Sequence, residues 1–310
     1  MNKTKIVISS LVIIVLGTTL MHAQSSRTWV SGTGNDGNPC TRSLPCKTFD
    51  GAIFKTAAGG EVDVLDPGSY GSFTITKPIT IDGGSGQVAS ILVSATDGIV
   101  VQAGATDVVV LRNLSLQGSG TGINGIRFLS GRTLLIENCV INGFSNNGID
   151  IALSASGQAH ISKTTIENIG QVGIKATTTS GIAPVDIVDS KVIFANIGAQ
   201  ASDHSRMTVT RSTLNYEGSV GLMADSPIGD SIAVIKDSEI CFNGFGVKTS
   251  SGADSSLKTS IFVSSSRVAF NTVAFDSTAG GQNFTFQNNE IVSNKTPTTA
   301  ASIPSPVPLM

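Results

Sequence analysis

The chain is 310 residues long, carries a formal net charge of −2, and contains 40% hydrophobic but only 14% charged residues. Lysine and arginine are scattered, so the chain lacks the basic patch that holds a nucleic-acid backbone, which argues against a nucleic-acid partner. With 34 glycines and few long charged residues that favour helices, the composition is typical of an all-β chain. The length allows two average domains, but repeat architectures run longer as one unit.

Residues 1–23 have the features of a secretory signal peptide. Lys3 and Lys5 precede a largely apolar run over residues 6–16, and Ala23 offers a small residue at the cleavage point. The alternative, an uncleaved membrane anchor, needs an apolar run of roughly 20 residues, which this segment and all later ones fall short of. We therefore predict cleavage near Ala23 and a secreted or periplasmic protein with no membrane span after cleavage.

Residues 24–60 are predicted to form an N-terminal cap. Cys40 and Cys46 lie in a short loop with Pro45, which favours a local disulfide, whereas a metal site would need further ligands that are not near. Residues 48–57 can form a short helix suited to lying across the open end of a repeat structure. Its apolar face would carry Phe49, Ile53 and Ala57.

From residue 108 onward, a six-residue segment with apolar first and last positions recurs eight times and aligns without a gap. Successive copies end 22 to 28 residues apart, and a coil with loops at its corners absorbs such variation easily. The eight last positions are predicted to stack as one inward ladder of the core. They are Leu116, Ile141, Ile166, Val192, Leu214, Ile240, Val268 and Ile291.

A second apolar patch follows a glycine in each repeat, so one coil contains about three short strands separated by turns. We predict a right-handed parallel β-helix over residues 61–294, with less regular coils before Val108. The glycines are predicted to mark corners that need positive φ. They are Gly125, Gly148, Gly173, Gly198, Gly221 and Gly246.

The tail, residues 295–310, is rich in proline, which cannot donate a backbone hydrogen bond to a neighbouring strand. We therefore predict that the tail is loose and forms no paired strand. Its prolines are Pro297, Pro304, Pro306 and Pro308.

Outward positions of stacked coils also form columns, so a binding face would appear as a column instead of a linear motif. Opposite charges alternate along part of the turn column, and such pairs favour strand register at about 0.2 to 1 kcal/mol each without indicating catalysis. Cys139 and Cys241, four coils apart, are predicted to be buried free thiols. The turn column is Asn113, Asn138, Lys163, Asp189, Arg211, Asp237, Ser265 and Asn288.

One pair indicates more specific chemistry, because His160 and Asp186 occupy equivalent outward positions in adjacent coils. A carboxylate beside a histidine can raise its basicity, as a general base for hydrolysis or β-elimination requires. A glycosidase needs two carboxylates about 5 to 10 Å apart, which Asp186 and Asp189 could supply. The alternative is a surface contact, since no third group or nucleophile is identified.

Asp63, Asp66 and Asp82 lie in the early coils, and Ca²⁺ requires clustered hard oxygens. No loop has the Asp-rich spacing of a dedicated calcium motif. These three residues are therefore the candidate metal ligands, and Ca²⁺ is the one candidate cofactor.

The opening from Trp29 to Cys40, followed by Pro45-Cys-Lys-Thr-Phe49 and a short helix, resembles the start of bacterial right-handed β-helix repeat proteins of the pectin-lyase-like superfamily. The repeats extend this resemblance through Asn289. The superfamily includes lyases, hydrolases, esterases, epimerases, phage spikes and adhesins, so the resemblance implies a fold and leaves the reaction open. The Asp-Asp, Gly-His-Gly and Trp-Ile-Asp-His strings of its polygalacturonases and pectate lyases are absent, so no catalytic residue is carried over.

Three functions remain open at this point. The first is an exported protein that contacts glycans or a cell surface through a long face without a recognisable catalytic site. The second is a polysaccharide lyase or glycoside hydrolase whose site lies on one exposed face, near His160, Asp186 and Asp189. The third is a purely structural envelope protein. Aromatic residues make up only 5% of the chain, which offers few platforms on which sugar rings could stack.

Overall fold

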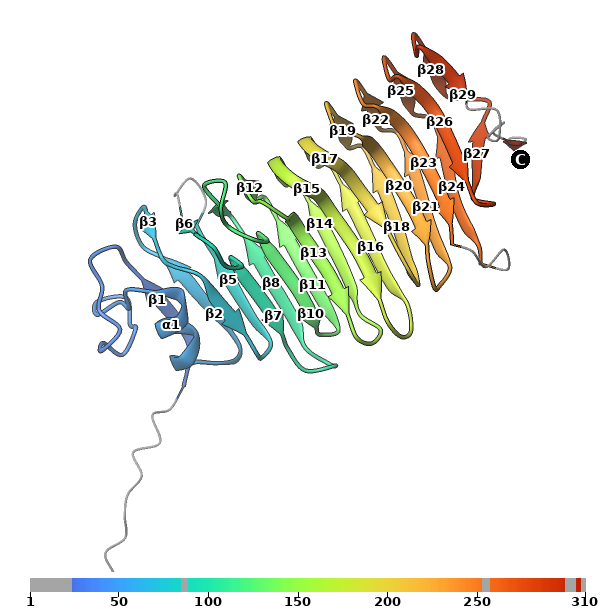
Figure 1. Cartoon of the computed structure of the whole chain (residues 1–310). Helices are drawn as coiled ribbons and strands as arrows, with labels where there is room; N and C mark the ends of the chain where they lie inside the picture. Colours follow the sequence, from blue (N-terminus) through green and yellow to red (C-terminus); the bar gives the residue numbers. More distant parts are fainter. Residues whose placement is uncertain (1–23, 85–88, 253–256, 299–304, 308–310) are drawn as a thin grey trace, which may run out of the picture.

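The computed structural model describes residues 24–84, 89–252, 257–298 and 305–307. These ranges wind into one elongated solenoid, with helix α1 (Phe49–Lys55) at one end and strands β28 and β29 near the other (Figure 1). Strands of successive coils pair in parallel, as in the pairing of β8, β11 and β14. The fold is the predicted right-handed parallel β-helix. The predicted signal peptide, residues 1–23, lies outside the described residues.

Each regular coil contributes one strand to a first sheet, sheet A, and two strands to a second, sheet B. Twelve of the described strands form sheet A. They are β1 (Ser25–Val30), β2 (Thr56–Val64), β5 (Ile79–Asp82), β8 (Val108–Arg112), β11 (Thr133–Glu137), β14 (Gln158–Ser162), β16 (Ala183–Val188), β18 (Ser205–Thr210), β21 (Ser231–Lys236), β24 (Thr259–Ser264), β27 (Gln282–Phe286) and β30 (Ser305–Val307).

The other eighteen described strands form sheet B, and in β15 and β17 the two strands of a coil run together. They are β3 (Gly68–Ser69), β4 (Phe73–Ile75), β6 (Ala89–Leu92), β7 (Ile99–Gln102), β9 (Leu114–Gln117), β10 (Ile126–Ser130), β12 (Val140–Asn142), β13 (Asn147–Leu153), β15 (Thr165–Thr178), β17 (Lys191–Ala201), β19 (Thr213–Asn215), β20 (Val220–Ser226), β22 (Glu239–Cys241), β23 (Phe245–Ser251), β25 (Arg267–Ala269), β26 (Val273–Thr278), β28 (Glu290–Val292) and β29 (Thr296–Thr298).

The predicted inward ladder packs in the core along sheet B. Leu116 pairs with Ile141 and Ile141 with Ile166, and the same register continues through Val192 to Leu214. These five side chains are at most 1% exposed. Because each inward position repeats in every coil, like residues stack about 4.8 Å apart and bury one another.

We call the turn between each sheet A strand and the next sheet B strand the first corner. Its turn residue has a left-handed backbone in seven coils, with φ between 47° and 59°. These residues include polar types that tolerate this conformation best. They are Asn113, Asn138, Lys163, Asp189, Arg211, Asp237 and Ser265.

A ladder of buried hydroxyl groups lies directly behind the first corner. Each hydroxyl accepts a hydrogen bond from the backbone of the preceding coil and donates one within its own coil. For example, Ser212 Oγ accepts from Ser190 N at 3.1 Å and donates to Thr210 O at 2.8 Å. The corner therefore leaves few buried backbone groups unpaired. The hydroxyl ladder consists of Thr164, Ser190, Ser212, Ser238 and Ser266.

The six repeat glycines do not have the positive φ that we predicted for them, so that prediction is wrong. Glycine is needed there because successive coils approach too closely for a side chain. A Cβ on Gly148 would lie 2.6 Å from Gly173 O, and one on Gly173 would lie 2.3 Å from Val192 Cγ1. The requirement is steric and acts between coils.

Helix α1 covers the start of the solenoid and ends at Lys55, so the prediction that it extends to Ala57 is wrong. Thr48 caps its first turn by accepting a hydrogen bond from Gly51 N. Thr56 already belongs to β2, because pairing with β1 competes successfully for the backbone. No described helix is long and apolar enough to cross a membrane. The buried residues of α1 are Phe49, Ala52 and Ile53.

The cysteines are distributed as predicted. Cys40 and Cys46 form a disulfide that closes the cap loop. Cys139 and Cys241 are buried free thiols. Burial raises the pKa of the Cys139 thiol to about 12, so it is neutral and unreactive at physiological pH.

Strand pairing extends into the proline-rich tail, so the prediction of a tail without paired strands is wrong. Strand β29, which contains Pro297, pairs with β26, and β30 pairs with β27 with Pro306 opposite Thr285. Both strands belong to the final coil, where a missing N–H on the outer edge breaks no ladder bond.

The last repeat is also one residue out of the predicted register. Val263 pairs with Thr285 and not with Phe286, whereas Val268 pairs with Ile291 as predicted. The turn between β27 and β28 therefore holds one more residue than the turns before it.

Candidate functional site

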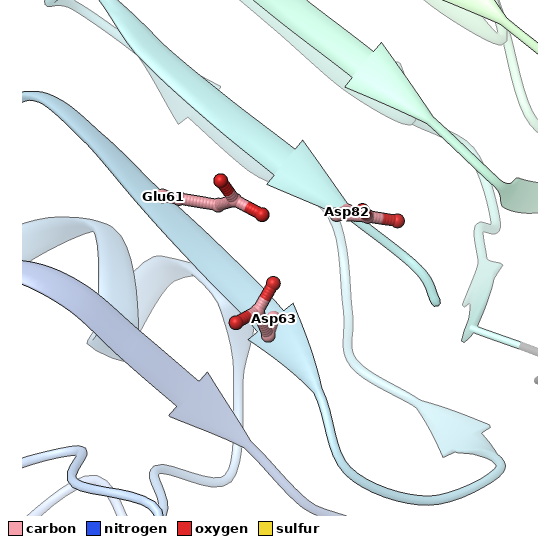
Figure 2. Close-up of side chains that lie close together, drawn as sticks. All are labelled: Glu61, Asp63 and Asp82. Carbon is pink, nitrogen blue, oxygen red and sulfur yellow. The ribbon is translucent and has the colours of Figure 1, made fainter. Parts of the chain in front are cut away.

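Three carboxylates meet on the outer face of sheet A near the cap, and we call them the acidic cluster. Glu61 and Asp63 alternate with inward residues along β2, and the register places Asp82 of β5 opposite Asp63. One oxygen atom of each carboxylate lies within 4.8 Å of the others. Figure 2 shows the three side chains gathered on the two neighbouring strands.

Two arginines from the flanking strands hold the acidic cluster together. Arg27 of β1 donates a hydrogen bond to Asp63. Arg112 of β8 donates to Asp82 Oδ2 at 2.8 Å and to Glu61 Oε1 at 3.2 Å. The two guanidinium groups therefore neutralise most of the negative charge that the three carboxylates can carry.

The surroundings of the acidic cluster shift the pKa values of Glu61 and Asp82 in opposite directions. Burial, followed by the hydrogen bond and charge of Asp63, raises the pKa of Glu61, although the arginines oppose this change. For Asp82, burial acts in the same direction, but hydrogen bonds from Asn113 and a backbone N–H and the charge of Arg112 outweigh it and lower the pKa. Asp82 therefore ionises more readily than Glu61.

The acidic cluster does not fit Ca²⁺ in its present arrangement. Its oxygens are of the hard type that this ion prefers, but Ca²⁺ takes about six to eight ligands. Arg27 and Arg112 already bond to the three carboxylates, so a cation would have to displace both.

The fold brings together two of the three predicted metal ligands and places the third elsewhere. Asp63 and Asp82 come together, and Glu61, which sequence reasoning missed, joins them because it lies two residues before Asp63 on the same face. Asp66 lies elsewhere and ties the cap to β2, accepting hydrogen bonds from Ser31 Oγ at 2.5 Å and Gly32 N at 2.6 Å.

A polar hollow of about 370 Å³ adjoins the acidic cluster at the first corner, and we call it the corner groove. Hydrogen bonds link the turn residues of successive coils along it. Asn113 Nδ2 donates to Asp82 Oδ1 at 2.7 Å, and Asn138 Nδ2 donates to Asn113 Oδ1 at 2.8 Å. The lining consists of Asp82, Arg112, Asn113, Glu137, Asn138, Ser162 and Lys163.

Two charged side chains of the corner groove remain available to a ligand. Glu137 and Lys163 make no side-chain hydrogen bond or ion pair with any residue in the described part of the chain. Arg112, which the strand register places opposite Glu137, bonds to the acidic cluster instead. The groove thus presents the Glu137 carboxylate and the Lys163 ammonium group, whose charge also acts on Asp189, beside the hydrogen-bonded amides of Asn113 and Asn138.

The predicted catalytic residues meet only in part. The register places His160 opposite Asp186, as the alignment indicated, but no hydrogen bond or ion pair joins them within the described ranges. Asp189 is engaged by Arg211, whose Nε and Nη2 donate to its two oxygens at 2.7 and 3.1 Å. That hydrogen bonding, with the guanidinium charge, lowers the pKa of Asp189 and makes it a poor proton donor.

A stack of exposed aromatic rings runs along the second corner, the turn between the two sheet B strands of each coil. We call its four residues, Phe194, Tyr216, Phe242 and Phe270, the aromatic ladder. Consecutive ring centroids lie 5.7, 4.8 and 5.0 Å apart, and the last two pairs are nearly parallel. Each side chain is 42–52% exposed. The ladder places four of the chain's 16 aromatic residues on one surface.

Sequence reasoning missed the aromatic ladder, although the repeat alignment contains its signal. Each aromatic lies two residues after the last position of an aligned segment, for example Tyr216 after Leu214. The aromatic content of 5% is an average over the whole chain, so it does not show that four aromatic residues share one column of successive coils.

A ladder of buried side chains lies directly behind the second corner, as one does behind the first. Asn243 Oδ1 accepts from Glu217 N at 2.9 Å, and Asn271 continues the pattern by accepting from Asn243 N at 2.9 Å. Unlike Asn243 and Asn271, Glu217 carries a carboxyl group and not an amide. Its Oε2 accepts from Ala195 N at 2.5 Å, its Oε1 has no partner among the described residues, and burial raises its pKa to about 8.

No family model matches the chain, and no curated protein matches it. Solved structures do match its fold. Pectate lyase Pel9A is 14% identical over 89% of this chain and 81% of that chain, with a TM-score of 0.54. A rhamnogalacturonan lyase is 13% identical over 78% and 74%, with a TM-score of 0.49. The A-module of the mannuronan C-5 epimerase AlgE4 of Azotobacter vinelandii is 10% identical over 81% and 91%, with a TM-score of 0.48. At these identities the likeness shows the fold alone.

Proposed function

We propose that this protein, which has a pectin-lyase-like parallel β-helix fold, is exported and binds polysaccharide on its outer surface without turning it over. The corner groove is the single observation that carries this proposal. Every residue that lines it is polar or charged, and successive coils supply it with hydrogen-bond donors and acceptors, which suits the hydroxyl groups of a sugar chain.

The free groups of the corner groove define how a sugar chain would be held. Lys163 can donate to sugar oxygens and Glu137 can accept from sugar hydroxyls, while Arg112 and Asn113 stay in place through their bonds to Asp82. Because these fixed partners need no reordering, binding costs less side-chain entropy. Pectate lyase Pel9A, whose fold this chain shares, is named for an action on a polysaccharide.

Turnover has weaker support than binding. Hydrolysis or β-elimination needs a base held in place by a third group, but His160 and Asp186 are not bonded to each other in the described structure. Asp189 is bonded to Arg211, and the acidic cluster is bonded to two arginines. A polysaccharide lyase or hydrolase therefore remains the alternative hypothesis, which an activity assay must test.

The test uses residues 24–310 and a panel of neutral and acidic polysaccharides, with affinity electrophoresis to measure binding. Lys163→Ala with Glu137→Ala should weaken retention about tenfold or more, because two hydrogen-bonding groups are lost. Lys236→Ala, an exposed lysine on the same face away from the groove, is the matched control. Retention that the double variant leaves unchanged, or no retention by any polymer, overturns the proposal.

The same incubations separate binding from catalysis. Reducing ends report hydrolysis, and absorbance of unsaturated products reports elimination. Binding without either signal supports the proposal. A signal that disappears in His160→Ala with Asp186→Ala would establish the enzymatic alternative at that pair, and a signal that persists in this variant would place an active site elsewhere.

A further inference from the structure

The aromatic ladder has a backbone conformation that bulky residues rarely adopt. All four residues have positive φ, between 58° and 62°. Such a conformation is strained for a residue that is not glycine, and stacking between neighbouring rings offsets part of that strain. Stability alone gives little reason to place aromatic residues there.

The backbone of this corner does not require aromatic residues. In other coils the same column holds Gly143, Asn168 and Ser293, which also have positive φ. These small or polar residues suit the left-handed conformation better. The four aromatic residues are therefore an addition to the corner, confined to neighbouring coils and turned toward solvent.

The size of the exposed surface favours a narrow ligand over a folded partner. Four half-exposed aromatic side chains offer roughly 400 Å² of surface. A stable protein–protein contact buries about 800 Å² on each side, about twice as much. A single extended chain that lies along the ladder can cover it completely.

The charges beside the ladder favour a neutral ligand. The neighbouring outward column of sheet B is mixed in sign, with Lys191, Glu239 and Arg267 in different coils. Arg267 lies 5.4 Å from the centre of the Phe270 ring and 3.5 Å from Glu290, which neutralises it. A polyanion would therefore gain little from this face.

We propose that the aromatic ladder is a binding ridge for a neutral, extended, β-linked polysaccharide that runs parallel to the solenoid axis. The ring spacing of 4.8 and 5.0 Å is close to the advance of one sugar residue in such a chain, so successive sugars meet successive rings. Stacked rings turn their edges outward. These edges pack against sugar C–H groups, and their partial positive charge faces sugar oxygens.

This proposal rests on the proposed function and adds a second surface and a class of polymer. The test compares hydroxyethylcellulose with carboxymethylcellulose, which share a β-linked backbone and differ in charge, by affinity electrophoresis of residues 24–310. Tyr216→Asn with Phe242→Asn removes two central rings and retains a residue type that this column tolerates at Asn168. Phe54→Gln, which removes a 78% exposed aromatic residue outside the ladder, is the matched control.

We expect hydroxyethylcellulose to retard the wild type and the control, and the ladder variant to bind it about tenfold or more weakly. Circular dichroism and thermal unfolding verify that each variant is folded. Weakened binding in the Lys163 and Glu137 variant with an unchanged ladder variant would overturn this inference and leave the proposed function standing. If the wild type binds none of the polysaccharides, both this inference and the proposed function are overturned.

Two further outcomes would also overturn the inference. The first is tighter binding of carboxymethylcellulose than of hydroxyethylcellulose, because the ladder would then not select a neutral polymer. The second is a dimer in sedimentation velocity that the ladder variant disperses, because the rings would then contact a second copy of this chain.

Discussion

The first and second corners of the solenoid meet the same backbone demand with different side chains. Both need a residue with left-handed φ in coil after coil, and both place a hydrogen-bonding ladder behind it. The first corner uses polar turn residues over hydroxyl groups. The second uses aromatic turn residues across four coils, and the buried side chains behind them include the acid Glu217 and the amides Asn243 and Asn271. A left-handed turn therefore fixes the backbone and leaves the outer surface free to vary.

The comparison separates turn residues whose type the fold explains from turn residues whose type it does not explain. At the first corner, Asn113 and Asn138 suit the left-handed turn and bond to each other, so the fold by itself explains their residue type. At the second corner, a phenylalanine such as Phe242 is poorly suited to its own backbone. The four predictions below test this contrast, from the largest expected effect to the smallest.

The two buried ladders should differ in their response to pH because only the second contains an acid. The pKa of Glu217 is about 8 in the folded state against 4.5 for an ordinary glutamate, so folding favours the neutral form. The contribution of neutral Glu217 to the free energy of unfolding is fully present below pH 4.5. It falls as the pH rises and is lost by about pH 8. Glu217→Gln should remove this loss, which amounts to about 3 kcal/mol at pH 7.

Denaturant unfolding of the wild type and Glu217→Gln at pH 5 and pH 8 measures the effect. The difference in unfolding free energy between the two proteins should grow with pH. An equal difference at both pH values would show that Glu217 ionises normally in the folded protein.

A single hydroxyl of the first corner should be harder to replace than its small size suggests. Ser212→Ala leaves Ser190 N without its acceptor and removes one of the two hydrogen bonds that Thr210 O accepts, the other of which comes from Asp189 N. The expected loss is about 1 to 3 kcal/mol of unfolding free energy, measured by chemical denaturation. Ser180→Ala, at an exposed loop position, should change stability by less than about 0.5 kcal/mol. Equal effects in the two variants would refute the ladder's contribution.

Glycine should affect the two corners differently. Phe242→Gly relieves the left-handed backbone but loses stacking on both Tyr216 and Phe270, so we expect a net loss of about 1 to 2 kcal/mol. Asp237→Gly relieves the same strain and loses a long contact with Lys236 and a screened attraction to Arg211, so we expect a change within about 0.5 kcal/mol. Thermal unfolding of both variants measures the two changes in stability. A larger loss of stability for Asp237→Gly than for Phe242→Gly would contradict the prediction.

The smallest effect is expected at the exposed ion pair of the first corner. Asp189→Asn removes the charge that holds Arg211 but keeps a residue type suited to positive φ. Solvent and salt screen such a pair, so we expect no measurable change in the unfolding midpoint at physiological ionic strength. A clear destabilisation would show that charge pairing along the turn column supports the coil.

Much of the fold follows from local repetition, whereas the errors arise where coils or chain ends meet. The inward ladder through Ile141 and Ile166 was predictable because each buried position recurs with one period. The role of Gly173 was misjudged, since the steric conflict there involves atoms of the next coil. Pro306 was assigned to a loose tail because its place at an outer edge depends on the coil beneath it.

The candidate sites were predictable to a smaller extent. Asp63 and Asp82 could be suspected from their residue types, but their contact, and the exclusion of Asp66, depend on the register of β2 against β5. His160 and Asp186 were aligned correctly, yet side-chain placement left them without a bond in the described structure. Alignment therefore predicts which residues are neighbours and does not predict which of them interact.

The sequence by itself determined the coil, its three strands, its buried columns and the Cys40–Cys46 loop, because these depend on periodicity and on contacts between residues close in the chain. Only the tertiary structure decided what the outer surface offers. The aromatic ladder and the acidic cluster arise from residues many positions apart that lie one coil from each other. Stacking about 4.8 Å per coil turns a weak sequence recurrence into a continuous surface, which is where the proposed binding takes place.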